Sequence, residues 1–208
     1  MHIPDGFLTP NVWIPLWAIA AGIIYTAAKK TNKSLGEKQV PLMGVLAAFI
    51  FAGQMLNTPV AGGTSGHMLG GVLAAVFLGP WTASIVMASV FIIQALLFQD
   101  GGITVLGANI INMGFVGTIL GYYIYQAIYA VLKNRALSAG IAGWFSLVLG
   151  SLACAVELGL SGTVAMWVAI PAMLSVHVVI GLIEAGITFA SVTYVKSRRP
   201  DLLELPKI

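Results

Sequence analysis

The chain has very little charge. Only 8% of its 208 residues are Asp, Glu, Lys or Arg, whereas 59% are hydrophobic, and the mean hydropathy is +0.96. Soluble domains carry about 25% charged residues, so water cannot be the main solvent of this chain. Because the apolar runs follow one another almost without pause, we expect one integral membrane domain over residues 1–208.

Cysteine is also scarce, since the one cysteine, Cys154, lies deep in an apolar run. This excludes a disulfide framework and a cysteine-rich metal site. The formal net charge of +3 does not indicate a nucleic-acid partner. The basic residues stand at the ends of apolar runs and do not alternate with aromatic residues, so we expect no nucleic acid.

Motifs of energy-coupling or hydrolytic enzymes are absent from the sequence. It has no G-x-x-x-x-G-K-[ST] phosphate loop, no H-E-x-x-H and no G-x-S-x-G, and the glycine-rich stretch at 62–68 has no lysine for a phosphate. We therefore expect no enzyme and no bound organic cofactor. The opening Met-His-Ile-Pro-Asp-Gly carries no positive charge, so we expect it to be retained rather than cleaved as a signal peptide.

Seven apolar runs are candidates for membrane-spanning helices, because a bilayer core of about 30 Å needs roughly 20 helical residues. After an N-terminal segment of residues 1–10, the runs lie near 11–30, 40–57, 67–79, 81–98, 104–132, 139–158 and 166–195. The run 67–79 is short. It could be a separate span, or it could continue across Gly79-Pro80 into the next run as one kinked helix.

The basic residues decide between these alternatives, because all ten fall into three clusters. The clusters are Lys29, Lys30, Lys33 and Lys38; Lys133 and Arg135; and Lys196, Arg198, Arg199 and Lys207. Lys and Arg accumulate on the cytoplasmic side, and the clusters share one side only if 67–79 crosses by itself. We therefore predict an all-α integral membrane protein with seven transmembrane helices, the N-terminus outside and the C-terminus cytoplasmic.

This topology places His2 and His67 in the same compartment. A histidine beside a free amino terminus can bind a metal through three nitrogens: the α-amine of Met1, the amide nitrogen of His2 and His2 Nδ1. The two chelate rings are unstrained, and His67 can supply a fourth nitrogen. Four nitrogens in a plane favour Ni(II) or Cu(II). The alternative is that His2 lies on a frayed chain end and His67 is a polar residue at a helix start.

Other polar residues leave two interpretations open. Asp5 and Asp100 can orient a ligating imidazole, or they are ordinary exposed loop carboxylates. His177 and Glu184 are seven residues apart and share one face of the last span. They can form a transit site for a cation or a proton, or they can be hydrogen-bonded packing residues.

Small residues repeat every four positions in the second span, at Gly44, Ala48 and Ala52. This spacing puts them on one helical face, which lets another backbone come close. We expect packing within the chain, with a docking face for a partner as the alternative.

The same residues resemble a known family, the cobalt/nickel substrate-capture component (CbiM/NikM-like) of energy-coupling-factor (ECF) transporters. The matching stretches are Met1 through Leu8, Gly66 through Gly71, Gln99 through Thr104, Leu106 through Asn109, and His177 through Gly181 with Glu184. The opening His-Ile-Pro-Asp-Gly is the most specific of them. The resemblance implies that Met1, His2 and His67 bind the metal, and it assigns no firm role to Asp5, Asp100, Asn57 or Glu184.

The resemblance also implies partners. Similar proteins work with a transmembrane coupling subunit and two cytoplasmic ATPase subunits, often with a small additional membrane subunit, in the cell membrane of a prokaryote. The face of Gly44, Ala48 and Ala52 resembles the A-x-x-x-A docking motif of other capture components.

Three hypotheses follow for the function. The first is capture of Ni(II) or Co(II) from outside, for import driven by partner ATPases. The second is a self-sufficient, proton-coupled divalent-cation permease that uses His177 and Glu184. The third, an intramembrane metalloenzyme, is disfavoured because no nucleophile or general base is paired with the histidines.

Overall fold

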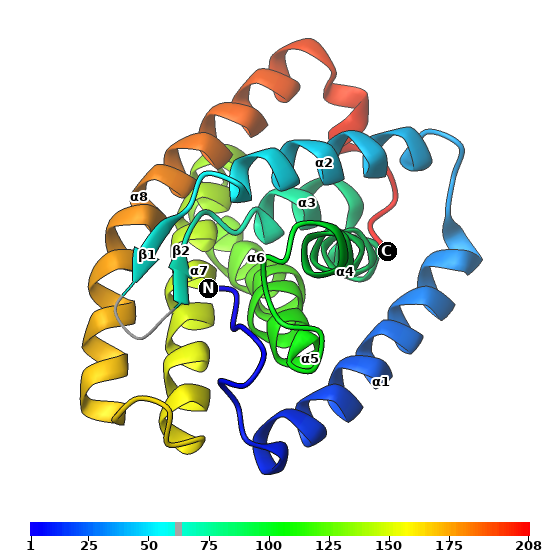
Figure 1. The fold of residues 1–208 in the computed structure, drawn as a ribbon. Helices are drawn as coiled ribbons and strands as arrows, with labels where there is room; N and C mark the ends of the chain where they lie inside the picture. Colours follow the sequence, from blue (N-terminus) through cyan, green and yellow to red (C-terminus); the bar gives the residue numbers. More distant parts are fainter. Residues whose placement is uncertain (61–63) are drawn as a thin grey trace.

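The computed structural model describes residues 1–60 and 64–208, and this part of the chain is almost entirely helical (Figure 1). The α-helices of eight or more residues are α1 (Pro10–Ser34), α2 (Gln39–Gln54), α3 (Gly71–Leu78), α4 (Pro80–Leu97), α6 (Gly121–Leu132), α7 (Arg135–Leu160) and α8 (Met166–Arg198). The short helix α5 (Leu106–Asn109) and a π-helical segment, η1 (Ile110–Leu120), lead directly into α6. The remaining elements are an antiparallel hairpin of β1 (Thr58–Val60) and β2 (Thr64–Gly66), and the 3-10 turn η2 (Pro200–Leu203). Gly62 and Gly63 of the glycine-rich stretch lie outside the described residues.

Each apolar run of the sequence contains a helix. In the described chain, five helical runs are long and apolar enough to cross a membrane: α1, α4, the continuous run 106–132, α7 and α8. Helix α2 is apolar but shorter, at 16 residues. The fold is therefore that of a multi-pass membrane protein, while seven full crossings remain a prediction.

The run 67–79 departs most from expectation. Its helix, α3, has only eight residues, which is about 12 Å of helix and too short to cross a bilayer alone. Residues 67–70 connect it to strand β2 without regular structure. All eight residues of α3 are buried inside the bundle. The expected helix over 67–79 is wrong in its first four residues, and non-helical backbone is tolerated at such depth because protein rather than lipid surrounds it.

The three basic clusters meet at one end of the bundle. Arg135 donates a hydrogen bond to Glu204 at 2.7 Å, and Lys38 Nζ lies 3.8 Å from Asp201. Both carboxylates belong to the segment that follows α8. The third basic cluster lies in the last turn of α8 and in this same segment. The clusters therefore share one side, as the charge pattern predicts. That this side is cytoplasmic remains a prediction.

The small residues of α2 face outward. Gly44, Ala48 and Ala52 are exposed, and a Cβ added at Gly44 would meet no atom within 4 Å. The expectation of packing within the chain is therefore wrong, because α2 turns its other face, with Ile50 and Gln54, into the bundle.

Candidate metal-binding site

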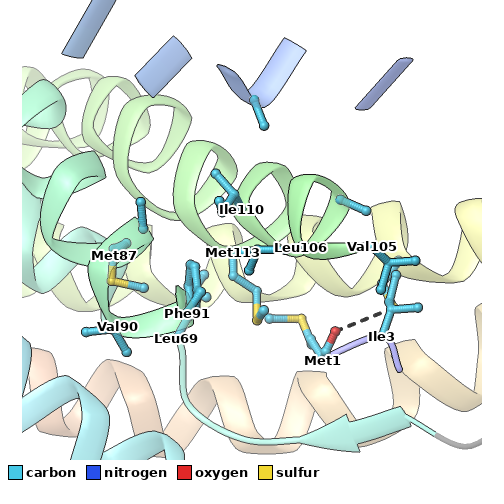
Figure 2. Close-up of a cluster of buried hydrophobic side chains, with 14 of the residues drawn as sticks. Met1, Ile3, Leu69, Met87, Val90, Phe91, Val105, Leu106, Ile110 and Met113 are labelled. Carbon is cyan, nitrogen blue, oxygen red and sulfur yellow. Dashed lines mark hydrogen bonds between the residues drawn. The ribbon is translucent and has the colours of Figure 1, made fainter. Parts of the chain in front are cut away.

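The N-terminal segment enters the middle of the helical bundle, where the chain start lies close to strand β2 and helix α7 (Figure 1). Met1 and Ile3 are fully buried, and His2 is 4% exposed. Figure 2 shows the side chain of Met1 directed toward Met113 of η1, with Leu106 of α5 nearby. A frayed chain end is therefore the wrong interpretation of His2.

Hydrogen bonds to both the amide and the carbonyl of Ile3 fix the N-terminal segment in place. The Asn109 side chain accepts from the Ile3 amide at 2.9 Å and donates to the Ile3 carbonyl at 3.1 Å, and the Gly102 amide donates to the same carbonyl at 2.8 Å. The carboxylate of Asp5 accepts from the Thr104 amide at 2.8 Å. These contacts fix the direction in which the chain approaches its own first two residues.

Two glycines make this approach possible. A Cβ at Gly102 would lie 2.3 Å from the amide nitrogen of Asp5. Gly101 has a positive φ of 95°, and a Cβ there would lie 3.0 Å from Asn109 Nδ2 and 3.3 Å from the His2 ring. The Gln-Asp-Gly-Gly stretch is thus needed because the N-terminal segment presses against its backbone.

His2 and His67 are brought together. Their rings are stacked with centroids 4.6 Å apart and 23° between the planes, and His67 is 1% exposed. The α-amine of Met1 lies against Ser65, two residues before His67, with the Ser65 carbonyl as a partner and Ser65 Oγ at 3.1 Å. Both sequence-predicted histidines and the predicted amine therefore meet in one buried place.

Each histidine keeps one ring nitrogen free of hydrogen bonds. His67 Nδ1 lies 2.7 Å from the Met68 carbonyl, which can only accept, so Nδ1 carries the hydrogen and Nε2 the lone pair. His2 Nε2 lies 3.0 Å from Gln94 Oε1. In the part of the chain that the structure describes, His67 Nε2 and His2 Nδ1 are buried without a hydrogen-bond partner. Buried polar atoms without partners are costly, and here they are the atom types that bind transition metals.

Burial keeps the N-terminal donors neutral. Desolvation lowers the pKa of the Met1 amine from 8.0 to about 5, and the nearby Cys154 and Asp100 act in the opposite direction. Desolvation and the nearby amine lower the pKa of His2 from 6.5 to about 3. At neutral pH both groups therefore present lone pairs rather than protons, which is the form that binds a metal.

The two loop aspartates, Asp5 and Asp100, contact different groups. Asp100 Oδ1 lies 3.3 Å from His2 Nδ1, so its carboxylate stands beside the candidate ligand, and burial raises its pKa. Asp5 instead accepts hydrogen bonds from the 103–104 backbone, so of its two interpretations the one in which it orients an imidazole is wrong. Its carboxylate fixes the backbone turn at 102–104.

Glu184 and His177 lie on the buried face of α8. Glu184 accepts from the Leu69 amide at 2.6 Å and the Gly70 amide at 2.9 Å, so it anchors the segment that carries His67. His177 Nδ1 lies 2.7 Å from the Met173 carbonyl, and its Nε2 has no hydrogen-bond partner among the described residues.

Two residues of the site were missed in the sequence, Gln54 and Gln94. Both are fully buried, and Gln94 contacts His2 directly. An uncharged amide inside an apolar run is a weak signal, because such residues also hold helices together. Only the contact with His2 distinguishes Gln94 from an ordinary packing residue.

The fold and the buried nitrogen donors together define a multi-pass membrane protein with a candidate site for a transition metal. The family described as "Cobalt uptake substrate-specific transmembrane region" (CbiM) matches residues 2–202, so the chain belongs to this family. It is a CbiM/NikM-like substrate-capture component, a cobalt/nickel uptake transmembrane protein.

Relatives named as nickel transport proteins and as cobalt transport proteins each match 98% of this chain. A putative fused nickel transport protein NikMN of Archaeoglobus fulgidus is 41% identical, and this chain covers 68% of its length. The fused nickel transport protein NikMN of Rhodobacter capsulatus is 34% identical, with 64% of its length covered. The cobalt transport protein CbiM of Sorangium cellulosum is 32% identical, with 95% covered.

A solved structure has the same fold. The crystal structure of a truncated transition metal transporter is 41% identical and superposes with a TM-score of 0.91. The match covers 95% of this chain and 99% of that one.

Proposed function

We propose that this chain captures Ni(II) or Co(II) from outside the cell through a nitrogen chelate of the Met1 amine, the His2 amide and Nδ1, and His67 Nε2. The proposal rests chiefly on one observation. The His2 and His67 rings are stacked in a buried site, each with an unpartnered ring nitrogen, beside a buried amino terminus.

The chemistry of the donors supports this ligand set. The amine and the amide nitrogen close one chelate ring through the Met1 backbone, and the amide and Nδ1 close the second through the His2 side chain. A planar set of four nitrogens suits Ni(II). The nickel and cobalt transport names of the relatives agree with either metal as the transported substrate.

Import would need energy from other chains. We propose that the protein works in the cytoplasmic membrane of a prokaryote, with a transmembrane coupling subunit and two cytoplasmic ATPase subunits. A small additional membrane subunit is also expected. The exposed face of Gly44, Ala48 and Ala52 on α2 is the proposed contact with the coupling subunit.

The permease alternative has weaker support. Both carboxylate oxygens of Glu184 are engaged by backbone amides of residues 69 and 70. A relay carboxylate must exchange its partners as the ion passes, whereas these bonds hold the His67 segment in place.

A one-residue extension tests the proposal. Adding a residue before Met1 moves the amine out of its chelate ring, while the histidines stay in the chain. Calorimetry should show severely weakened Ni(II) binding compared with the protein that begins at Met1. Equal affinities would refute the amino-terminal chelate.

A further inference from the structure

A chain of buried amides connects the segment beside His67 with His2. Gln54 Nε2 lies 2.7 Å from the Leu69 carbonyl oxygen, Gln94 Nε2 lies 2.9 Å from Gln54 Oε1, and Gln94 Oε1 lies 3.0 Å from His2 Nε2. Both glutamines are fully buried, and they lie at the C-terminal end of α2 and in the last turn of α4. The chain ends on the imidazole that the proposed function assigns to the metal.

The hydrogen bond to the Leu69 carbonyl fixes the orientation of both glutamine amide groups. The Leu69 carbonyl can only accept a hydrogen bond, so the atom of Gln54 that faces it must be the amide nitrogen. Gln54 Oε1 then faces Gln94 and needs a donor, which turns the amide nitrogen of Gln94 toward it. Gln94 Oε1 is left facing His2. His2 Nε2 must therefore carry a hydrogen, and Nδ1 must hold the lone pair.

One competing acceptor lies on the other side of the ring. Asp100 Oδ1 is 3.3 Å from His2 Nδ1, a position from which it could accept a hydrogen on Nδ1. The contact does not form a hydrogen bond, whereas Gln94 lies at 3.0 Å with hydrogen-bond geometry. The glutamine chain therefore sets the tautomer, and Asp100 is left to face whatever Nδ1 binds.

We propose that Gln54 and Gln94 are positioning residues that hold His2 as its Nε2–H tautomer, so that Nδ1 is presented for the chelate. This deepens the proposed function and rests on it only for its effect on metal binding. The tautomer itself belongs to the metal-free protein.

The segment of residues 68–69 orients both histidines, but it fixes the hydrogen on Nδ1 in His67 and on Nε2 in His2. The Met68 carbonyl fixes the hydrogen on His67 Nδ1, while the next carbonyl, that of Leu69, starts the chain that fixes the hydrogen on His2 Nε2. Glu184 holds this segment from α8 by accepting the Leu69 amide at 2.6 Å. A metal ligand whose other nitrogen is hydrogen-bonded keeps both its tautomer and its orientation.

The three histidines of the chain make the tautomers measurable. In the full, metal-free protein labelled with ¹⁵N-histidine, only six ring nitrogens give signals, and His2→Ala, His67→Ala and His177→Ala assign them. We expect Nε2 of His2 to be protonated and Nδ1 bare. For His67 and His177 we expect the reverse, because their Nδ1 atoms face the carbonyls of Met68 and Met173.

Three variants separate positioning from simple destabilisation. Gln94→Leu removes the acceptor, so His2 should shift toward the Nδ1–H form and Ni(II) binding should weaken about 10- to 100-fold. Gln94→Glu retains an acceptor for His2 Nε2 and should keep the native tautomer, although it can donate to Gln54 Oε1 only when it is protonated. Gln39→Leu is the matched control. Gln39 is also buried and bonded to backbone, donating to Pro206 at 2.9 Å, but it lies at the opposite end of the bundle.

Each outcome bears on the proposal. A bare Nε2 on His2 in the unsubstituted protein would overturn it, and so would Gln94→Leu with unchanged His2 signals. A tautomer change in Gln39→Leu equal to that in Gln94→Leu would also overturn it, by showing that any lost buried glutamine has this effect. If the tautomers are as stated but the one-residue extension leaves Ni(II) affinity unchanged, the positioning role stands and the amino-terminal chelate fails.

Discussion

His2 and His67 lie 65 positions apart in the chain, yet their rings are stacked with centroids 4.6 Å apart. Both side chains are buried, with His2 4% exposed and His67 1% exposed. A metal that reaches both must therefore enter a closed site, and its binding should respond sharply to small changes around the two rings.

The first prediction concerns the direct ligands. His2→Ala and His67→Ala should each weaken Ni(II) binding by at least about 100-fold, because removing a ligand costs more than removing a residue that only orients one. His177→Ala is the control, since the proposed chelate does not use this ring, and it should change the affinity less than about tenfold. Calorimetry on the three variants decides. An equally large loss with His177→Ala would make His177 a further ligand.

The second prediction concerns pH. Above pH 5 the Met1 amine and the His2 ring are already neutral in the folded protein, so a bound metal displaces no proton from them. Only the His2 amide proton must leave, and Ni(II) affinity should rise about tenfold per pH unit between about pH 6 and 8. The free peptide Met-His-Ile-Pro-Asp-Gly keeps ordinary pKa values near 8 and 6.5, so its affinity should rise more steeply. Equal slopes in titrations of protein and peptide would contradict the buried, neutral site.

The third prediction concerns the glycine against which the N-terminal segment packs. Gly102→Ala places a Cβ 2.3 Å from the backbone nitrogen of Asp5, so one of the two segments must shift. We expect a loss of about 1–3 kcal/mol in stability and weaker Ni(II) binding. Gly22→Ala on the exposed face of α1 meets no atom within 4 Å and should be neutral or slightly stabilising. Thermal unfolding in detergent compares the two, and similar behaviour would mean that the segment does not depend on this close approach.

The fourth prediction concerns the sides of the membrane. Three basic clusters at one end of the bundle predict a cytoplasmic C-terminus and an external site. A reporter fused after Ile208 should be active only if it reports a cytoplasmic location. Activity only on the external side would reverse the orientation and place the histidines inside.

The fifth prediction concerns energy. The isolated chain should hydrolyse no ATP, because the sequence contains no phosphate-binding loop. Vesicles that contain only this chain should accumulate no metal against its gradient, even with a proton gradient imposed. Uphill accumulation under these conditions would favour the permease hypothesis.

That Met1, His2 and His67 lie together in the candidate site could be predicted because the signals are local. The opening Met-His pair defines two chelate rings without reference to the rest of the chain, and the charge clusters place His67 on the same side. The roles of Glu184, Asp5 and the two glutamines could not be predicted in this way. Each depends on a partner far along the chain, such as the 115 positions between Leu69 and Glu184.

The sequence by itself determined that the chain lies in a membrane, where its apolar runs fall and which residues carry the nitrogens that we propose as metal ligands. Hydropathy and charge are sums over neighbouring residues, so they can be read without contacts. Only the tertiary structure decided that the N-terminal segment enters the bundle, that α3 is a short buried helix and that the small face of α2 points outward. These features arise because the chain must satisfy its buried backbone and amide groups with distant partners, and a linear pattern does not specify which partners those are.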